Sequence, residues 1–389
     1  MPWQKRSVMD QREDLVRLAL APDGKVAELC RRFGISRANA YKWLARYRME
    51  GRAGLADRSR RPRRSPTRAG QVVEAEVLRI RDKSNNAWGA RKIARVMERS
   101  DTVEVPALST ITEILRRHGR LDQRRDEHPG PHQRFERAQP NELWQMDFKG
   151  HFPLTEGRCH PLTVLDDHSR YSLTIGACGN EQDATVRAQL VRVFRCYGLP
   201  FGMLMDNGAP WGDSGHQPHT IFTVWLMRLG IPVIHGRPFH PQTQGKDERF
   251  HRSLKAEVLH GKSFCDLAEC QRAFDRWRYV YNHERPHEAL AMGTPAQRYR
   301  ASPRVFPEML PAIEYAAGDI VRKANKNGDI SFNGRILSVG KAFRGQPIAL
   351  RPTGQDGVLS IHYCAHRIGL LSLRSPAQQI QHAQTEQPA

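Results

Sequence analysis

Three acidic residues, Asp147, Asp206 and Glu248, lie where their carboxylates could hold divalent cations. Asp147 lies within a strand-like segment, Asp206 ends a short apolar run, and Glu248 lies in the first turns of a long amphipathic segment. Lys255 follows on the same helical face as Glu248. Hard cations such as Mg²⁺ take carboxylate ligands, and a pair of them can activate an attacking oxygen and stabilise a leaving oxygen. The chemistry that these residues predict is metal-dependent cleavage or transfer of a phosphodiester bond.

The elements that must position these side chains begin near Pro140. Three runs rich in branched and aromatic residues are typical of antiparallel strands: LWQMDFKGHF, HPLTVLDDHS and YSLTIGAC. Alternating helices and short strands follow, up to a long helix over about residues 244–259. This order predicts a mixed α/β sheet with helices on both faces. Such sheets bind ligands at the carboxyl ends of their strands, although an Asp there, taken alone, is more often a turn residue.

Charge points to a polyanionic partner. The 389 residues carry 61 Lys and Arg against 41 Asp and Glu, a net charge of +20, so nucleic acid is the first candidate. Acidic proteins or membrane surfaces are alternatives that charge leaves open. No stretch approaches the roughly 18 apolar residues of a spanning helix, and no apolar run follows the N-terminal charges, so we expect no membrane partner and a cytosol-like compartment. Seven scattered cysteines without a C-x-x-C pair predict neither disulfides nor zinc.

The N-terminal residues predict a helical DNA-binding domain. Helical periodicity covers about residues 11–20, 25–33 and 37–51, with Gly34 ending the second helix and Ser36 capping the third. Helix, tight turn and helix form the helix-turn-helix plan, whose second helix enters the major groove. A three-helix bundle with solvated basic residues is the alternative. On the outer face of the third helix we expect DNA contacts from Arg37, Asn39, Tyr41 and Lys42.

Two further segments connect this domain to the sheet. A tract rich in Arg, Pro and Ser predicts a linker, and its arginines suit phosphates or a narrow minor groove, although a solvated tract fits the composition almost as well. The arginines concerned are Arg58, Arg60, Arg61, Arg63 and Arg64. Three more helical patterns then predict a second helix-turn-helix, with Ser109 as a helix cap.

Behind the sheet, Gly-punctuated strand-like runs predict a small β-barrel, and a Gln-rich tail predicts disorder.

Several motifs in order along the chain give a specific resemblance. WQMDFKG, VLDDHSRY, DNGAPW, HPQTQGKDERFHRSLK and YNHERPHEALAMGTPAQRY resemble the catalytic core of insertion-sequence DDE transposases related to retroviral integrases. The resemblance implies a ribonuclease-H-like core behind helix-turn-helix domains and so covers most of the chain. The predicted order is a helix-turn-helix domain at 1–57, a basic linker at 58–67, a second helix-turn-helix at 68–121, a linker at 122–138, the integrase core at 139–300, a β-barrel at 301–375 and a disordered tail at 376–389.

The resemblance also implies roles for individual residues. Asp147, Asp206 and Glu248 match the metal-binding and catalytic triad, and Lys255 matches a DNA contact. The implied cofactor is Mg²⁺, with Mn²⁺ as a substitute and two ions per site. The implied reaction is hydrolysis of a strand at the element's end to free a 3′-OH, followed by transfer of that hydroxyl to target DNA, without a covalent protein–DNA intermediate.

The chain departs from the family pattern in two respects. The segment between Asp206 and Glu248 is longer than is common in this superfamily, and it contains WGDSGHQPHT. Asp213 or Asp247 could compete with Glu248, but the GKDER register favours Glu248. The His-His-Cys-Cys module of retroviral relatives is absent, so no structural zinc is expected.

Other polar residues of the motifs have less defined roles. In this family the strand ending in Asp166 and Asp167 is not catalytic, and we interpret both as turn and structural residues. His240 and Asn207 are candidates to line the site.

The function favoured by these patterns is a bacterial transposase that recognises terminal inverted repeats. Its expected partners are double-stranded DNA, both element ends and target, and further copies of itself, because two DNA ends must be brought together. Its expected place is the cytoplasm, at the nucleoid. A regulator or domesticated transposase that binds DNA without cutting is the main alternative, and the intact triad argues against it. A nuclease acting on RNA–DNA hybrids is a third reading, which the two helix-turn-helix segments disfavour.

Overall fold

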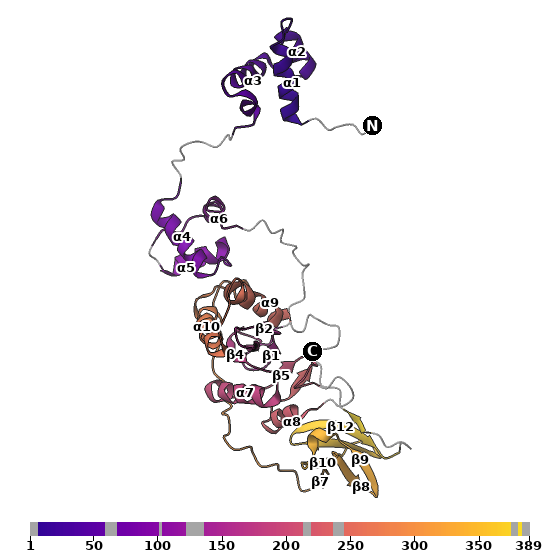
Figure 1. Cartoon of the computed structure of the whole chain (residues 1–389). Coiled ribbons are helices and arrows are strands. Elements are labelled where there is room, and N and C mark those ends of the chain that lie inside the picture. Colours follow the sequence, from indigo (N-terminus) through magenta and orange to yellow (C-terminus); the bar gives the residue numbers. More distant parts are fainter. Residues whose placement is uncertain are drawn as a thin grey trace. The chain divides into compact units, whose positions relative to one another are not determined.

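The computed structural model describes residues 7–58, 68–100, 103–121, 136–212, 219–235, 245–374 and 380–382 (Figure 1). The predicted linker arginines at 60–64, the tract that includes Asp213, and His240 lie outside these residues. The chain divides into two compact units, Met1–Arg68 and Ala69–Ala389, which are described separately. No helix in the described ranges has both the length and the apolar character needed to cross a bilayer.

The first unit is a three-helix domain formed by α1 (Val8–Ala19), α2 (Val26–Phe33) and α3 (Arg37–Glu50), followed by a short 3-10 turn. Gly34 ends α2 with a φ of 65°, which a residue without a side chain adopts easily. Ser36 caps α3 by accepting a hydrogen bond from the Asn39 amide at 3.3 Å. The predicted helix-turn-helix is therefore confirmed. Its core consists of Leu15, Val16, Cys30, Ala40, Trp43, Leu44 and Leu55.

Three more helices begin the second unit and share their own apolar core. They are α4 (Gln71–Lys83), α5 (Ala90–Ser100) and α6 (Leu108–Arg117). The predicted cap at Ser109 is wrong, because α6 begins at Leu108 and its cap residue is Ala107. Ala107 has no side-chain oxygen, and Ser109 lies inside the first turn of the helix.

A mixed sheet forms the centre of the second unit. Its main order is β4-β3-β1-β5-β6, with the short β2 pairing the beginning of β3. β3 runs antiparallel to β1 and β4, whereas β1, β5 and β6 are parallel. This is the predicted ribonuclease-H-like arrangement. The strands are β1 (Trp144–Phe148), β2 (Phe152–Pro153), β3 (Arg158–Asp166), β4 (Ser172–Cys178), β5 (Met203–Met205) and β6 (Val233–His235).

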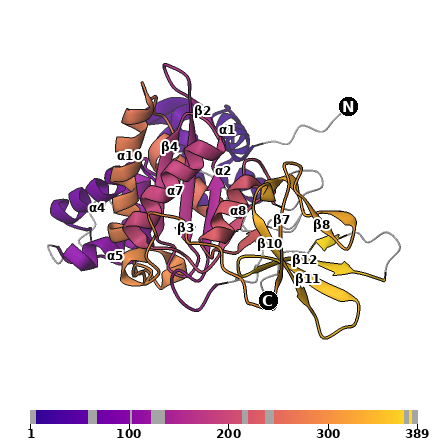
Figure 2. The same ribbon diagram turned by 90° about the horizontal axis from the view of Figure 1, so that it is seen from below.

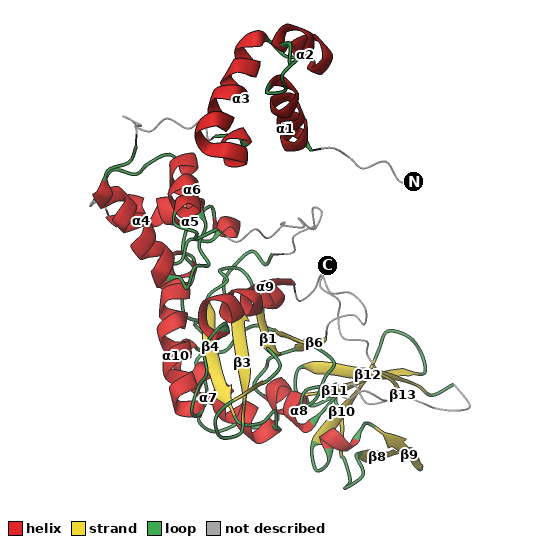
Figure 3. Cartoon of the chain, turned by 45° about the horizontal axis from the view of Figure 1, so that its top comes forward, coloured by secondary structure: helices red, strands yellow, loops and turns green. Residues whose placement is uncertain are grey.

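Helices cover both faces of this sheet (Figure 3). α7 (Asp183–Tyr197) and α8 (Ile221–Arg228) pack on one face, against residues that include Met146. α9 (Gly245–Leu254) and α10 (Leu267–Tyr279) pack on the other face. Since side chains alternate along a strand, the neighbour of Met146 at position 147 faces α9. π-turns at Lys255–Leu259 and Val280–Glu284 extend α9 and α10, and 3-10 turns follow at Glu288–Leu290 and Pro295–Gln297.

The C-terminal part is a five-stranded antiparallel sheet in the order β13-β12-β11-β10-β7, together with the hairpin β8–β9. Val224 and Met227 of α8 belong to its apolar core, so this sheet packs beside α8 (Figure 2). The described strands do not pair into a ring, and the barrel form is not confirmed. The strands are β7 (Ile320–Lys323), β8 (Asp329–Phe332), β9 (Arg335–Ser338), β10 (Pro347–Pro352), β11 (Val358–Tyr363), β12 (His366–Ser372) and β13 (Ile380–His382), with a 3-10 turn at Lys341–Phe343.

The tail differs from the prediction of disorder over 376–389. Ile380–His382 form β13, which pairs antiparallel with β12 and places Ile380 opposite Leu371. Ile380 packs against the core of the C-terminal sheet. One apolar residue beside an open strand edge is enough to add a short strand, which composition alone does not indicate.

Candidate active site

Asp147 and Asp206 lie side by side at the ends of adjacent parallel strands. In the β1–β5 pair, Trp144 lies opposite Met203 and Gln145 opposite Leu204. The same register, continued by two residues, aligns Asp147 with Asp206, which directly follows β5. The sheet order therefore brings together two carboxylates that are far apart in the sequence.

The charge of these neighbours changes the pKa of Asp147. Burial, followed by the nearby carboxylate of Asp206, raises the pKa of this carboxyl from 3.8 to about 7. Glu181 and Glu248 act in the same direction, with Glu181 making the larger contribution of the two. Neighbouring carboxylates raise one another's pKa because their negative charges repel. A bound divalent cation would stabilise their charged forms.

A turn after β5 holds the Asp206 carboxylate in place. Its Oδ1 accepts hydrogen bonds from the Gly208 amide at 3.0 Å and from the indole N–H of Trp211. Trp211 is buried and stacks on Phe148 at the end of β1, with ring centroids 5.4 Å apart. Through these contacts, the DNGAPW motif holds Asp206 next to the strand that carries Asp147. Asn207, a candidate site residue, is exposed beside it.

Helix α9 covers this edge and presents polar residues to it. Glu248 is exposed in the first turn of α9. Asp247 points the other way: it is 1% exposed, and neither of its carboxylate oxygens has a hydrogen-bond partner among the described residues. Burial raises the pKa of Asp247 well above its usual range, and the charge of Asp147 raises it further. A buried carboxyl next to Asp147 that lacks a hydrogen-bond partner among the described residues is a ligand that a cation could bind.

His251 is a site residue that sequence reasoning missed. Its Nδ1 lies 3.9 Å from Oδ2 of Asp147, and its Nε2 lies 2.8 Å from the hydroxyl of Thr163. That hydroxyl donates to the backbone oxygen of Asp147 at 2.9 Å, so its oxygen accepts from His251 Nε2–H. Burial, with the charge of Lys149, lowers the pKa of His251 to about 4 and keeps the ring neutral. Its place three residues after Glu248 on a helix was the available signal.

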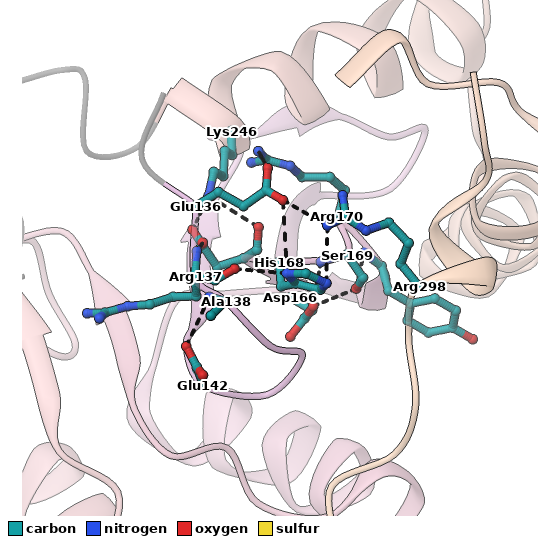
Figure 4. A network of polar contacts seen from close by, with 12 residues as sticks. Glu136, Arg137, Ala138, Glu142, Asp166, His168, Ser169, Arg170, Lys246 and Arg298 are labelled. Atoms are coloured by element: carbon teal, nitrogen blue, oxygen red, sulfur yellow. Dashed lines mark hydrogen bonds and ion pairs between the residues drawn. The ribbon is translucent and has the colours of Figure 1, made fainter. Parts of the chain in front are cut away.

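The start of α9 is anchored by a buried ion pair of Lys246, a residue that Figure 4 labels. Lys246 binds the carboxylate of Asp167, whose side chain is fully buried. Asp167 also accepts hydrogen bonds from the Arg137 amide at 2.8 Å and from Gln145 at 2.6 Å. Asp167 therefore ties β1 and the end of β3 to the helix of Glu248, which agrees with the structural role predicted for it.

The neighbouring carboxylates complete this network (Figure 4). Asp166 accepts from the amides of Asn141 at 2.6 Å and Ser169 at 2.8 Å, so it caps the turn as predicted. Glu136 receives the guanidinium groups of Arg170 at 3.2 Å and Arg298 at 3.0 Å. Asp166 and Asp167, at the end of β3, therefore both make structural contacts.

The remaining predicted residues are placed as follows. Lys255 is exposed, and burial together with the charge of Lys255 lowers the pKa of Lys149, so two cations lie at this edge of the core. Among the residues described, no three His, Cys, Asp or Glu side chains are already gathered closely enough to hold a metal ion. Glu248 is therefore near the two aspartates without being assembled with them.

In the first unit, the predicted DNA contacts Arg37, Asn39, Tyr41 and Lys42 are all exposed on α3.

The burial of Asp147 predicts a pH-dependent cost in the metal-free protein. Its pKa is higher in the folded chain than the 3.8 expected when unfolded, so the folded state loses stability as pH rises from about 4 to about 7. Asp147→Asn should therefore stabilise the core at pH 8 by about 2 kcal/mol, after allowance for the exposed fifth of the side chain. The gain should vanish below pH 4.

Urea unfolding in a chelator, followed by tryptophan fluorescence between pH 4 and 8, measures this difference. Asp183→Asn, which removes an exposed carboxylate paired with Arg187 on α7, serves as the control and should show no such pH-dependent gain. An equal stability of wild type and Asp147→Asn at pH 8 would contradict the account of the site.

Comparison with known families places matches along most of the chain. Models described as integrase core domains match residues 137–241 and 229–295. A helix-turn-helix domain matches residues 11–63, and a homeodomain-like domain matches residues 39–115. The C-terminal domain of IS481 family transposases matches residues 319–379.

Individual relatives come from mobile elements and viruses. An uncharacterized protein of insertion element IS476 from Xanthomonas euvesicatoria is 30% identical over 161 residues, 41% of this chain and 44% of that protein, so the match spans less than half of the relative. An uncharacterized protein of IS407 from Burkholderia multivorans is 24% identical over 63% of this chain and 89% of its own length. The magnesium complex of the HTLV-2 integrase catalytic core aligns with 42% of this chain and 99% of that one, at 15% identity and a TM-score of 0.32.

Proposed function

We propose that this chain, as an insertion-sequence DDE transposase with an integrase-like core, cuts the ends of its element and joins them to target DNA. The observation that carries this proposal is the alignment of Asp147 with Asp206 at the ends of β1 and β5, under the helix that carries Glu248. The proposed DNA ends are terminal inverted repeats, and the proposed place of action is the cytoplasm.

Asp147, Asp206 and Glu248 are proposed as the residues that hold divalent cations. The carboxyl of Asp247, which has no hydrogen-bond partner in the described part of the chain, and the raised pKa of Asp147 support a cation at this edge. Bound Mg²⁺ or Mn²⁺, proposed as two ions, would supply Lewis-acid stabilisation of the attacking and leaving oxygens. Trp211 and Lys246 hold the two sides of the site in place, and Lys149 with Lys255 would bind DNA phosphates.

DNA recognition is proposed to begin at α3. Asn39 and Arg37 lie at its start, where a recognition helix meets base edges, and both side chains are exposed. Asn39→Ala is expected to weaken binding to element-end DNA by about 1–3 kcal/mol and to relax sequence preference, because an amide can read adenine. Lys42→Ala should weaken binding to all sequences alike. Titrations against matched and scrambled duplexes separate the two effects, and equal losses for both variants would contradict base reading by Asn39.

The experiment that tests the function is strand cleavage and strand transfer with wild-type protein. The probe is labelled duplex DNA from each flank of the gene, incubated with Mg²⁺ or Mn²⁺ and a plasmid target. We expect free 3′-OH ends and covalent joining of those ends to the plasmid. Specific binding without any cut under these conditions would instead identify a DNA-binding regulator. We also propose that joining requires several copies of the chain on paired ends, which native gels of the joined products would show.

A further inference from the structure

The second helix-turn-helix module, residues 69–121, contacts the catalytic core through a buried carboxylate. Glu257 of the core accepts hydrogen bonds from the indole N–H of Trp88, in the module, at 3.2 Å and of Trp277, in α10, at 2.8 Å. The guanidinium Nε of Arg285 lies 3.0 Å from the same carboxylate. The Glu257 side chain is 4% exposed, so these donors replace water around a buried charge.

The backbone around Glu257 is shaped for this contact. Lys255–Leu259 form a π-turn directly after α9, in which the His260 amide donates to the Lys255 carbonyl at 2.8 Å. An α-helical bond would have used the carbonyl of Ala256 instead. That freed carbonyl accepts from the Asn85 side chain of the module at 3.1 Å. The π-turn therefore creates the acceptor that the module uses, and such turns, which are rare, occur frequently at functional sites.

A second π-turn repeats the arrangement at the end of α10. Val280–Glu284 close with the Arg285 amide donating to the Val280 carbonyl at 2.8 Å, which brings Arg285 next to Glu257. The module reaches this turn as well: Arg99 donates to the Glu284 carbonyl at 3.2 Å, and Lys83 pairs with the Glu284 carboxylate at 2.7 Å. The π-turns at Lys255–Leu259 and Val280–Glu284 thus contact the same module.

We propose that Glu257 is a positioning residue that locks the second helix-turn-helix module onto the helix carrying Glu248, and that this lock sets the distance along DNA from the bound segment to the bond that is cut. The inference rests on the proposed function for its second half. α9 and the π-turn form one continuous helical segment from Gly245 to Leu259, so the module and the catalytic edge are attached to a single rigid element.

Carboxylate chemistry explains why glutamate stands at this position. Two indole N–H groups and a guanidinium all donate, and a carboxylate accepts from every one of them. A glutamine would turn an N–H towards one of these donors and leave it unpaired. Lys92 of the module lies in the same cluster, where the charge of Glu257 offsets part of the burial that lowers the pKa of Lys92 to about 8.

Asn85 and Asn86 provide a matched pair of variants for testing the lock. Both have positive φ angles, 51° and 59°, so glycine fits either position without backbone strain. Asn85→Gly removes the contact with Ala256, whereas the Asn86 side chain makes no hydrogen bond to the core among the residues described. Trp88→Phe is a second variant that removes a donor to Glu257 and keeps the apolar ring.

Hydrogen–deuterium exchange on the full chain measures the lock without any requirement for activity. In Asn85→Gly and Trp88→Phe we expect deuterium uptake to rise roughly fivefold in residues 84–92 and 255–260, and to stay at the wild-type level in Asn86→Gly. Unchanged uptake in both variants would overturn the lock.

The second half is tested by mapping the cut on labelled flanking DNA. Asn85→Gly should bind the duplex within roughly twofold of wild type, while cleavage falls about tenfold and spreads to neighbouring bonds. If exchange becomes faster but the cut site and the cleavage rate stay unchanged, the proposed role of the lock in cleavage is overturned. The lock itself would still be supported. If the wild type cuts no probe, the proposed function fails, and exchange still decides whether the lock exists.

Discussion

Asp147→Asn, Asp206→Asn and Glu248→Gln are each expected to lower strand cleavage and strand transfer by at least roughly 10³-fold. An amide keeps the shape of the side chain but loses the negative charge that a hard cation needs. DNA binding should stay within about twofold of wild type, because the exposed residues of α3 are unchanged. Gel assays of cleaved and joined products, with filter binding in parallel, measure both quantities.

Glu181→Gln is the most informative companion to these variants. Glu181 raises the pKa of Asp147 more than Glu248 does, so electrostatics alone do not favour Glu248 as the third carboxylate. Glu181 accepts a hydrogen bond from His160 at 2.8 Å, which gives it a separate structural contact. We expect Glu181→Gln to retain more than about half of wild-type cleavage, since a carboxylate outside the metal shell acts only through screened charge. Activity in Glu248→Gln but not in Glu181→Gln would reassign the third ligand.

Asp167→Ala is expected to lower the free energy of unfolding of the core by about 3–5 kcal/mol. The substitution removes the carboxylate that Lys246 binds, where the Lys246 side chain is only 16% exposed, and it removes the acceptor for Gln145 and the Arg137 amide. The loss is large because removing one member of a buried ion pair costs far more than the pair contributed. Urea unfolding monitored by tryptophan fluorescence measures it.

Glu308→Ala is the matched control for that loss. Glu308 pairs with Arg195, and both side chains are more than half exposed, so breaking this pair should cost less than about 1 kcal/mol. Equal effects of the two substitutions would show that Asp167 does not anchor α9. If Asp167→Ala folds at low temperature, its cleavage should still fall, because the start of the helix that carries Glu248 has lost its attachment.

The element order of this chain could be predicted from the sequence because its signals are local. Gly34 and Ser36 mark the turn of the first domain, and both act there as a helix end and a cap. The alternation of strand-like and helical runs was sufficient to predict the mixed sheet. Ile380 shows the limit of local signals, since its strand exists only because β12 offers an open edge.

The candidate site was predictable only in part, because its remaining features depend on contacts between distant segments. The motifs indicated Asp147 and Asp206, but their alignment follows from the β1–β5 register. Lys246 and Glu257 carry no distinctive signal in the sequence, and His251 carries only its spacing from Glu248, because each acquires its role from partners that only the folded chain brings close. Two π-turns were likewise missed, as they continue the apolar periodicity of α9 and α10.

The most direct test of the central claim is anomalous diffraction from crystals of the full chain soaked in Mn²⁺. The account predicts manganese density in contact with the carboxylates of both Asp147 and Asp206, lost in Asp147→Asn crystals soaked in the same way. No manganese at this edge, or an ion bound elsewhere while Asp147 and Asp206 remain without one, would contradict the proposed metal-dependent active site.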